Sequence, residues 1–229
     1  MEKEVISEKV QEILEKLNIN IKELENEQLL LKKSILTKDS IDFDKIETIA
    51  GCGNSYFDNE IISSIAVLNK NMEVIEEKFF MEKMHFPYVS GFRAYREMPA
   101  MLKCYHKLEN SPDVIMIEGN GILHPRGIGL ASHFGLSIQK PTIGIAKDLM
   151  MGEVKDNKVY INNKVAAEVV ETKKGSNPIY VSIGHMISLE SAVKLVKKCM
   201  REPHKLPEPL VLAHRYAKKI RDEFSVKKE

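Results

Sequence analysis

The chain has no tryptophan, only three cysteines and almost no net charge. An odd number of cysteines without a C-x-x-C pair excludes a disulfide framework, offers no zinc site and fits a reducing cytosol. No apolar run approaches the length of a membrane-spanning helix, so we expect a cytoplasmic protein with no membrane partner. The formal charge of +1 gives no global argument for nucleic-acid binding, which must come from local patches.

The 229 residues are 43% hydrophobic, enough for one sizeable core. Residues 2 to about 34 carry apolar residues at helical spacing, and Asn18 and Asn20 divide them into two predicted helices. We expect a helical extension over 1–25, a main domain over 26–224 and a frayed end over 225–229. The amphipathic pattern of this extension predicts that its helices pack through their apolar faces. We expect a monomer, with self-association through these helices as the alternative.

Residues 46 to 83 contain three β-rich runs separated by short polar turns, which predict three antiparallel strands, the first ending near Gly53. Helical and buried-strand patterns then alternate. We predict helices over 91–108, 124–139, 188–200 and 206–224, strands over 114–117, 141–147 and 179–185, and a hairpin over 159–172. This order predicts an α/β fold, a ribonuclease H-like mixed central sheet with helices on both faces.

Ligands of such sheets bind at the carboxyl ends of the strands, which places Gly53, Glu118 and Lys147 together, with Glu97 leaning over the same edge. Glu118 directly follows the apolar run Val-Ile-Met-Ile, and a carboxylate there is costly to bury without a cation. Glu97, near a helix start, could instead simply favour the helix dipole. Mg²⁺ prefers oxygen ligands, so these two carboxylates are candidate Mg²⁺ ligands in phosphodiester hydrolysis, with Mn²⁺ as the alternative ion.

Six segments, in order, resemble the endonuclease V family, whose members act on deoxyinosine-containing DNA or inosine-containing RNA. They are IAG at 49–51, FPYVSGFRAYRE at 86–97, PDVIMIEGNGILHPRGIGLASHFGL at 112–136, PTIGIAK at 141–147, TKKGSNPIYVSIGH at 172–185 and PEPLVLAHRY at 207–216. The resemblance implies metal-dependent cleavage on the 3′ side of inosine. It also implies that Glu97 is at the active site, that Lys147 stabilises charge near the phosphate, and that His214 acts in acid–base chemistry or positions water.

The resemblance further implies how an extruded base is bound. Tyr88, stiffened by Pro87, matches the family's wedge; a core tyrosine is the alternative. Other residues implied in binding the base or a phosphate are Gly119, Gly121, His124 and Arg126, through bare backbone N–H groups, and Lys174 and Ser176, in a basic loop. Without the resemblance, both segments would be ordinary turns.

The chain departs from the family at residues 50–53, which read A-G-C-G where the family has A-G-V-D with a metal-binding Asp. Gly53 therefore supplies no ligand, and Asn54 points to the opposite face of the strand. Glu118 replaces the Asp of the family's D-G-Q-G and extends one methylene further. One hypothesis is that this longer side chain bridges part of the gap that Gly53 leaves. Two interpretations stay open: an endonuclease with an altered metal site, which we favour, or an inosine-binding homologue that has lost cleavage. An unrelated small-molecule enzyme would need a deep pocket in place of an open basic groove.

Overall fold

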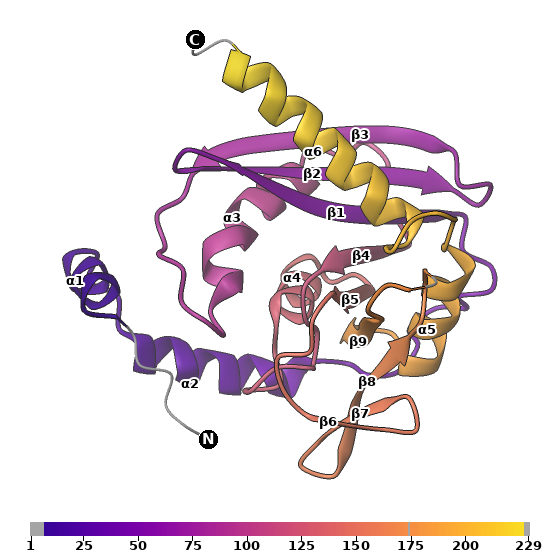
Figure 1. The fold of residues 1–229 in the computed structure, drawn as a ribbon, viewed down its shortest axis with the longest axis horizontal. Coiled ribbons are helices and arrows are strands. Elements are labelled where there is room, and N and C mark those ends of the chain that lie inside the picture. The colour runs from indigo at the N-terminus through magenta and orange to yellow at the C-terminus, as the bar shows by residue number, and fades with distance from the viewer. Residues whose placement is uncertain (1–6, 174, 227–229) are drawn as a thin grey trace.

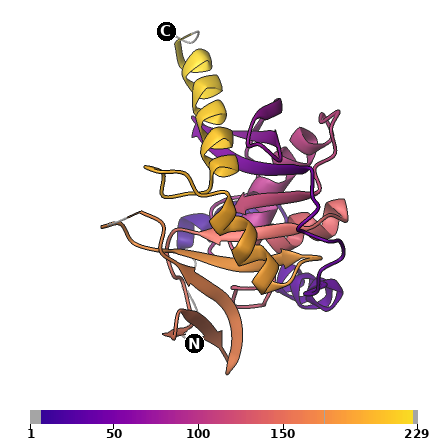
Figure 2. The same cartoon turned by 90° about the vertical axis from the view of Figure 1, so that its right-hand side faces the viewer.

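The computed structural model describes residues 7–173 and 175–226. The strands of this described part form one nine-stranded mixed sheet in the order β3-β2-β1-β4-β5-β9-β8-β7-β6. Their bounds are β1 Thr48–Phe57, β2 Glu60–Asn69, β3 Val74–Lys83, β4 Val114–Glu118, β5 Thr142–Ala146, β6 Glu153–Lys155, β7 Lys158–Ile161, β8 Lys164–Val170 and β9 Ile179–His185. Only the β1–β4 and β4–β5 pairs are parallel. The expected mixed sheet is confirmed, and Figure 2 shows the β7–β8 hairpin projecting away from the C-terminus.

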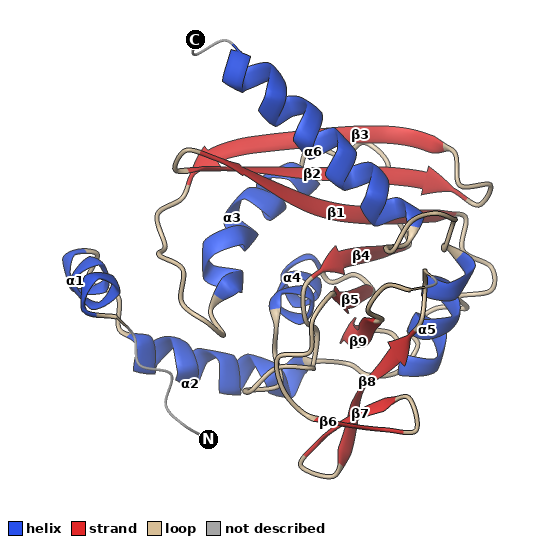
Figure 3. Ribbon diagram, in the orientation of Figure 1, coloured by secondary structure: helices blue, strands red, loops and turns tan. Residues whose placement is uncertain are grey.

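Helices cover both faces of this sheet (Figures 1 and 3). Helix α6 crosses β1 and β2 on one face, and α3 packs against β2 and β3 on the other. The helices are α1 Glu8–Lys16, α2 Ile21–Leu31, the 3₁₀ turn η1 Lys32–Ser34, α3 Arg93–Tyr105, α4 Leu130–Ile138, α5 Leu189–Lys198 and α6 Glu208–Val226. No helix of the described residues is both long and apolar enough to cross a bilayer.

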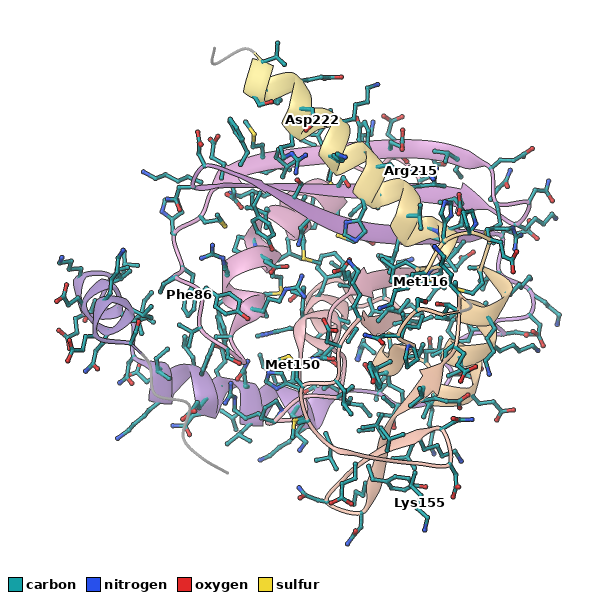
Figure 4. The ribbon with its side chains drawn as sticks, viewed as in Figure 1. Phe86, Met116, Met150, Lys155, Arg215 and Asp222 are labelled. Carbon is teal, nitrogen blue, oxygen red and sulfur yellow. The ribbon has the colours of Figure 1, made fainter. Side chains whose placement is uncertain are left out.

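The alternation of side chains along β4 divides the core into two halves. Val114 and Met116 face the cluster built with α5 and α6, whereas Ile115 and Ile117 face the cluster built with α3 and α4. All four are fully buried, and burying each contributes about 1.5–3 kcal/mol. In Figure 4, Met116 is labelled just below helix α6. Because the period is two residues, Glu118 continues the α6 side of this pattern.

Three of the differences from the predicted element boundaries are informative. Strand β1 does not end near Gly53 but runs on to Phe57, because it pairs with the apolar strand β2 as far as Glu60, and this pairing overrides the turn preference of Gly-Asn-Ser. Helix α4 begins at Leu130, not at His124, so residues 119–129 form a loop. Residues 225 and 226, expected to be frayed, belong to α6, and residues 227–229 lie outside the described part.

The two predicted N-terminal helices are confirmed as α1 and α2. Asn18 adopts a left-handed conformation with φ of 54°, which ends the first helix. Asn20 caps the second helix, because its side chain accepts a hydrogen bond from the Lys22 backbone N–H. These local signals are the reason why the break could be seen in the sequence.

Candidate functional site

The pairing of β1, β4 and β5 brings the expected strand residues together. Cys52 pairs with Ile117, so Gly53 lies beside Glu118, and Glu118 pairs with Ile145 on β5. Gly53 is therefore a mid-strand residue that reaches the site because its shorter neighbour β4 ends there. Helix α6 covers this face and contributes His214.

Glu118 is held between two nitrogen groups. Its Oε1 lies 2.8 Å from Nζ of Lys147, and its Oε2 lies 2.5 Å from Nε2 of His214. Burial alone would raise the pKa of Glu118, but His214 and then Lys147 outweigh it and bring the pKa down to about 2. Glu118 is thus ionised at neutral pH and forms the fixed negative charge of the site.

The imidazole of His214 fills the space that a side chain at position 53 would take. A Cβ built on Gly53 would lie 2.9 Å from Nδ1 of His214 and 3.1 Å from its Cγ. That spacing is tighter than ordinary van der Waals contact, so a larger residue here would require the ring to move. The absence of a side chain at Gly53 therefore lets His214 approach Glu118.

Glu97 lies on α3, on the opposite side of β1. Its carboxylate accepts hydrogen bonds from Nδ2 of Asn54 at 2.8 Å and from Nε of Arg93 at 2.5 Å, and the residue is only 2% exposed. Asn54 indeed points away from the face of Gly53, as expected. Burial lowers the pKa of Arg93, but Glu97, then Tyr56 and then Glu118 outweigh that and raise it, so this guanidinium interacts electrostatically with both carboxylates.

A metal ion would find its best donors at one point of this cluster. Oε2 of Glu118 and Nε2 of His214 are both buried and, although 2.5 Å apart, make no aligned hydrogen bond. These two ligand atoms, neither of which has a hydrogen-bond partner, fit an ion that takes its other ligands from water and a phosphate. Among the described residues, no group of three or more His, Cys, Asp or Glu is arranged to hold a metal, and Glu97 does not join Glu118 in one.

A cavity of about 220 Å³ opens directly beside this cluster. Glu118 and Lys147 line it on one side, and Tyr88, Gly91 and Arg93 line it on another. The volume gives room for a single nucleobase, with charged groups at its edge.

Tyr88 projects from an anchored loop. Its neighbours Phe86 and Val89 are buried in one apolar cluster with Leu14 and Phe92, whereas Tyr88 itself is 66% exposed. In Figure 4, Phe86 lies on the segment that precedes α3, on the side of the molecule where α1 and α2 lie. The alternative of a core tyrosine is therefore wrong, and Pro87 separates the buried Phe86 from the exposed ring.

The loop after β4 does not offer the bare backbone N–H groups that the sequence suggested at its two glycines. The Gly119 N–H donates to the Ile145 carbonyl and the Gly121 N–H to Oγ of Ser182, each at 2.9 Å. Gly121 is instead required by close packing, since a Cβ there would lie 1.9 Å from the carbonyl oxygen of Ile183. The expectation failed because the sequence does not reveal that this loop folds back onto β5 and β9.

His124 and Arg126 turn inward and meet at one carbonyl. Nε2 of His124 lies 3.1 Å from the Gly91 carbonyl oxygen, and Nη2 of Arg126 donates to the same oxygen at 2.8 Å. A carbonyl only accepts, so Nε2 of His124 carries the proton and its Nδ1 accepts from the Arg126 N–H. Burial, and then the Arg126 charge, lower the pKa of His124 to about 4, so this ring is neutral at pH 7.

Of the basic loop that was expected to clamp a phosphate, the described residues Lys173 and Ser176 do not line the cavity. Oγ of Ser176 donates to the carbonyl of Lys173 and closes a local turn. Lys174 lies outside the described residues. The role of this loop stays a prediction.

Arg93 and Gln28 are among the residues of the cavity wall that sequence reasoning missed. Arg93 stands four positions before Glu97, and this helical spacing could have revealed the ion pair. Gln28 also lines the cavity, from helix α2, and a single glutamine in an amphipathic helix gave no signal.

Comparisons with known proteins agree with one another. The model of the family described as endonuclease V matches residues 30–215. Endonuclease V of Dictyoglomus thermophilum is 36% identical over 208 residues, covering 87% of this chain and 90% of that protein. Endonuclease V of Thermosipho melanesiensis is 37% identical over 213 residues, covering 89% and 92%.

Solved structures show the same likeness. The crystal structure of endonuclease V from Bacillus subtilis superposes with a TM-score of 0.83 at 30% identity, covering 91% of this chain and 94% of that one. The Ciona intestinalis endonuclease V, in complex with a 24mer DNA containing an inosine followed by a ribo-adenosine, gives a TM-score of 0.82 at 29% identity, covering 89% and 98%.

Proposed function

Because the chain belongs to the endonuclease V family, we propose that it is a metal-dependent endonuclease that hydrolyses a phosphodiester bond on the 3′ side of inosine or deoxyinosine. The observation that carries the proposal is that the base-sized cavity and the charged cluster share Glu118 and Lys147. A base held in the cavity would bring its own phosphates to these two residues. The inosine-containing DNA bound by the Ciona relative supports this choice of substrate.

The metal would be held by Glu118, with His214 as its second protein neighbour. A divalent ion bound there would neutralise phosphate charge and lower the pKa of a bound water. We propose Mg²⁺ as the ion. Mn²⁺ is the alternative, and because Mg²⁺ prefers oxygen whereas this site offers one carboxylate and one imidazole, we expect Mn²⁺ to support faster cleavage.

The remaining charged residues would act on the phosphate and on proton transfer. Lys147 and Arg93 both line the cavity, so their cations are placed to stabilise negative charge that develops on the phosphate. Glu97, whose two oxygens are taken by Arg93 and Asn54, would act through Arg93 by holding it beside Glu118. His214 would position the attacking water and not transfer its proton, because its Nε2 is the atom that would face the ion.

We further propose that the protein acts in the cytoplasm. Its three cysteines are free and buried, which is typical of proteins in a reducing compartment.

The test uses labelled oligonucleotides that carry one inosine, as single- and double-stranded DNA and as RNA, with Mg²⁺ and then with Mn²⁺. Cleavage and binding are measured in parallel, and Glu118→Ala is the control. We expect cleavage near the inosine that disappears in the control. Inosine-dependent binding without any cleavage would instead indicate a protein that still binds inosine but has lost the cleavage activity. The absence of both binding and cleavage would overturn the proposal.

A further inference from the structure

Helix α2 contributes a buried polar side chain to the base cavity. Gln28 is only 1% exposed and lines the cavity, whereas Leu29 and Leu30 beside it are exposed. A buried amide is costly unless its donor and acceptor both find partners. Gln28 stands two residues before the segment that the family model matches.

The amide of Gln28 joins two loops that are far apart in the sequence. Its Nε2 donates to the Gly91 carbonyl at 3.1 Å, and its Oε1 accepts from Nε of Arg126. Gly91 follows the Tyr88 loop, and Arg126 belongs to the loop after β4. Both of the amide's partners therefore hold parts of the cavity wall.

Other contacts dock the same helix at this place. Nη1 of Arg126 lies 3.4 Å from Oε1 of Glu25, and the Tyr95 hydroxyl lies 2.8 Å from Oε2 of Glu27. The Arg126 guanidinium also lies over the ring of Phe92, 4.4 Å from its centroid. Arg126 is thus fixed on several sides, but Gln28 is the α2 residue that contacts both Arg126 and Gly91.

We propose that Gln28 is a positioning residue of the base cavity, which sets affinity for inosine by fixing Gly91 against Arg126. The inference rests on the proposed function, since it assigns the determinant of base affinity to the same site. It also gives helix α2 a part in recognition. The hydrogen bonds of Gln28 go to Gly91 and Arg126 and not to Glu118, His214 or Lys147, so it should act on binding and leave the chemical step unchanged.

The test compares Gln28→Met, which keeps length and loses both hydrogen bonds, with the unaltered protein. We expect about tenfold weaker binding of an inosine-containing oligonucleotide, unchanged binding of the same oligonucleotide with adenosine, and an unchanged cleavage rate at saturating substrate. Gln28→Glu keeps the acceptor for Arg126 and loses the donor to Gly91. Its affinity for the inosine-containing oligonucleotide should therefore lie between those of Gln28→Met and the unaltered protein.

The matched control is Leu24→Ala, because Leu24 packs α2 against the cluster of Leu14 and Phe86 and does not line the cavity. It should lower the melting temperature and leave the preference for inosine unchanged. The inference is overturned if Gln28→Met binds inosine like the unaltered protein, or if Leu24→Ala weakens the preference equally. If the unaltered protein shows no preference for inosine, the proposed function fails first and the inference falls with it.

Discussion

The base cavity and the charged cluster meet at Glu118 and Lys147, yet they are built in different ways. The cavity wall is set by the backbone: the Gly91 carbonyl gathers donors from Gln28, His124 and Arg126. The cluster is set by side-chain charges, because each oxygen of Glu118 faces a separate nitrogen group.

This difference explains why the two regions respond differently to substitution. A glycine of the cavity wall such as Gly129 is fixed by a backbone contact, since a Cβ there would lie 2.3 Å from the Asn120 carbonyl oxygen, so the cavity tolerates little change. At Gly53, by contrast, the space that a side chain would take is filled by the His214 ring. The cavity wall is therefore the part of the site that tolerates fewer substitutions, and the charged cluster is the part in which a metal ligand could be lost.

The largest effect should come from Glu118→Gln, which keeps volume and removes the fixed negative charge. Cleavage should fall about a thousandfold because the charge that holds the metal is lost, while inosine binding in EDTA stays unchanged. Single-turnover cleavage and fluorescence anisotropy would measure the two quantities, with the exposed Glu153→Gln as control. If inosine binding fell as much as cleavage, the cavity and the charged cluster would not act independently.

The second effect concerns His124 and acid. Its folded pKa of about 4 lies below its ordinary value of 6.5, because of burial and then Arg126. Between these pH values the unfolded chain binds a proton that the folded chain does not, so stability is full above pH 6.5 and falls as pH drops toward 4, by about 3 kcal/mol. Urea unfolding at pH 7 and pH 4 should show a smaller loss in His124→Gln than in the exposed control His106→Gln. Equal losses of stability in the two variants would contradict the conclusion that the His124 ring is buried and neutral.

Much of the fold could be predicted because its signals are local. The break between α1 and α2 follows from Asn18 and Asn20, and the buried strand β4 follows from its apolar run. The end of β1 could not be placed, because it depends on pairing with β2, which no local pattern at Gly53 reveals.

The site was predictable where strand alternation decides it. Gly53, Glu118 and Lys147 lie together because their strands are neighbours in the sheet. The partners of Glu97 and the inward turn of Arg126 depend on which helices meet across the sheet, and the sequence does not show this. Gln28 could not be identified from the sequence, because its hydrogen-bond partners lie in two loops that are distant in the chain.

The third effect asks whether the cluster can regain a ligand. Gly53→Asp with Glu118→Asp would give the carboxylate pattern that the resemblance to the family implies, and the new side chain must push the His214 ring aside. Two carboxylates in place of one should raise Mg²⁺ affinity about tenfold and reduce any advantage of Mn²⁺. Calorimetric titration with each ion would measure this, and Gly53→Asn with Glu118→Asp controls for size without charge. No gain in Mg²⁺ affinity or turnover would sink the idea that Gly53 marks a lost ligand position.

The smallest effect should come from the mouth of the cavity, at Tyr88. The ring is exposed, so Tyr88→Ala should leave the melting temperature unchanged, yet it removes the surface on which a neighbouring base could stack. Loss of one stacking contact costs about 1 kcal/mol, or roughly fivefold in the affinity for an inosine-containing duplex. Tyr88→Phe keeps the ring and should bind like the unaltered protein. If both variants lose the same affinity, the hydroxyl matters more than the ring, and Tyr88 contacts the nucleic acid as a hydrogen-bonding group rather than as a wedge.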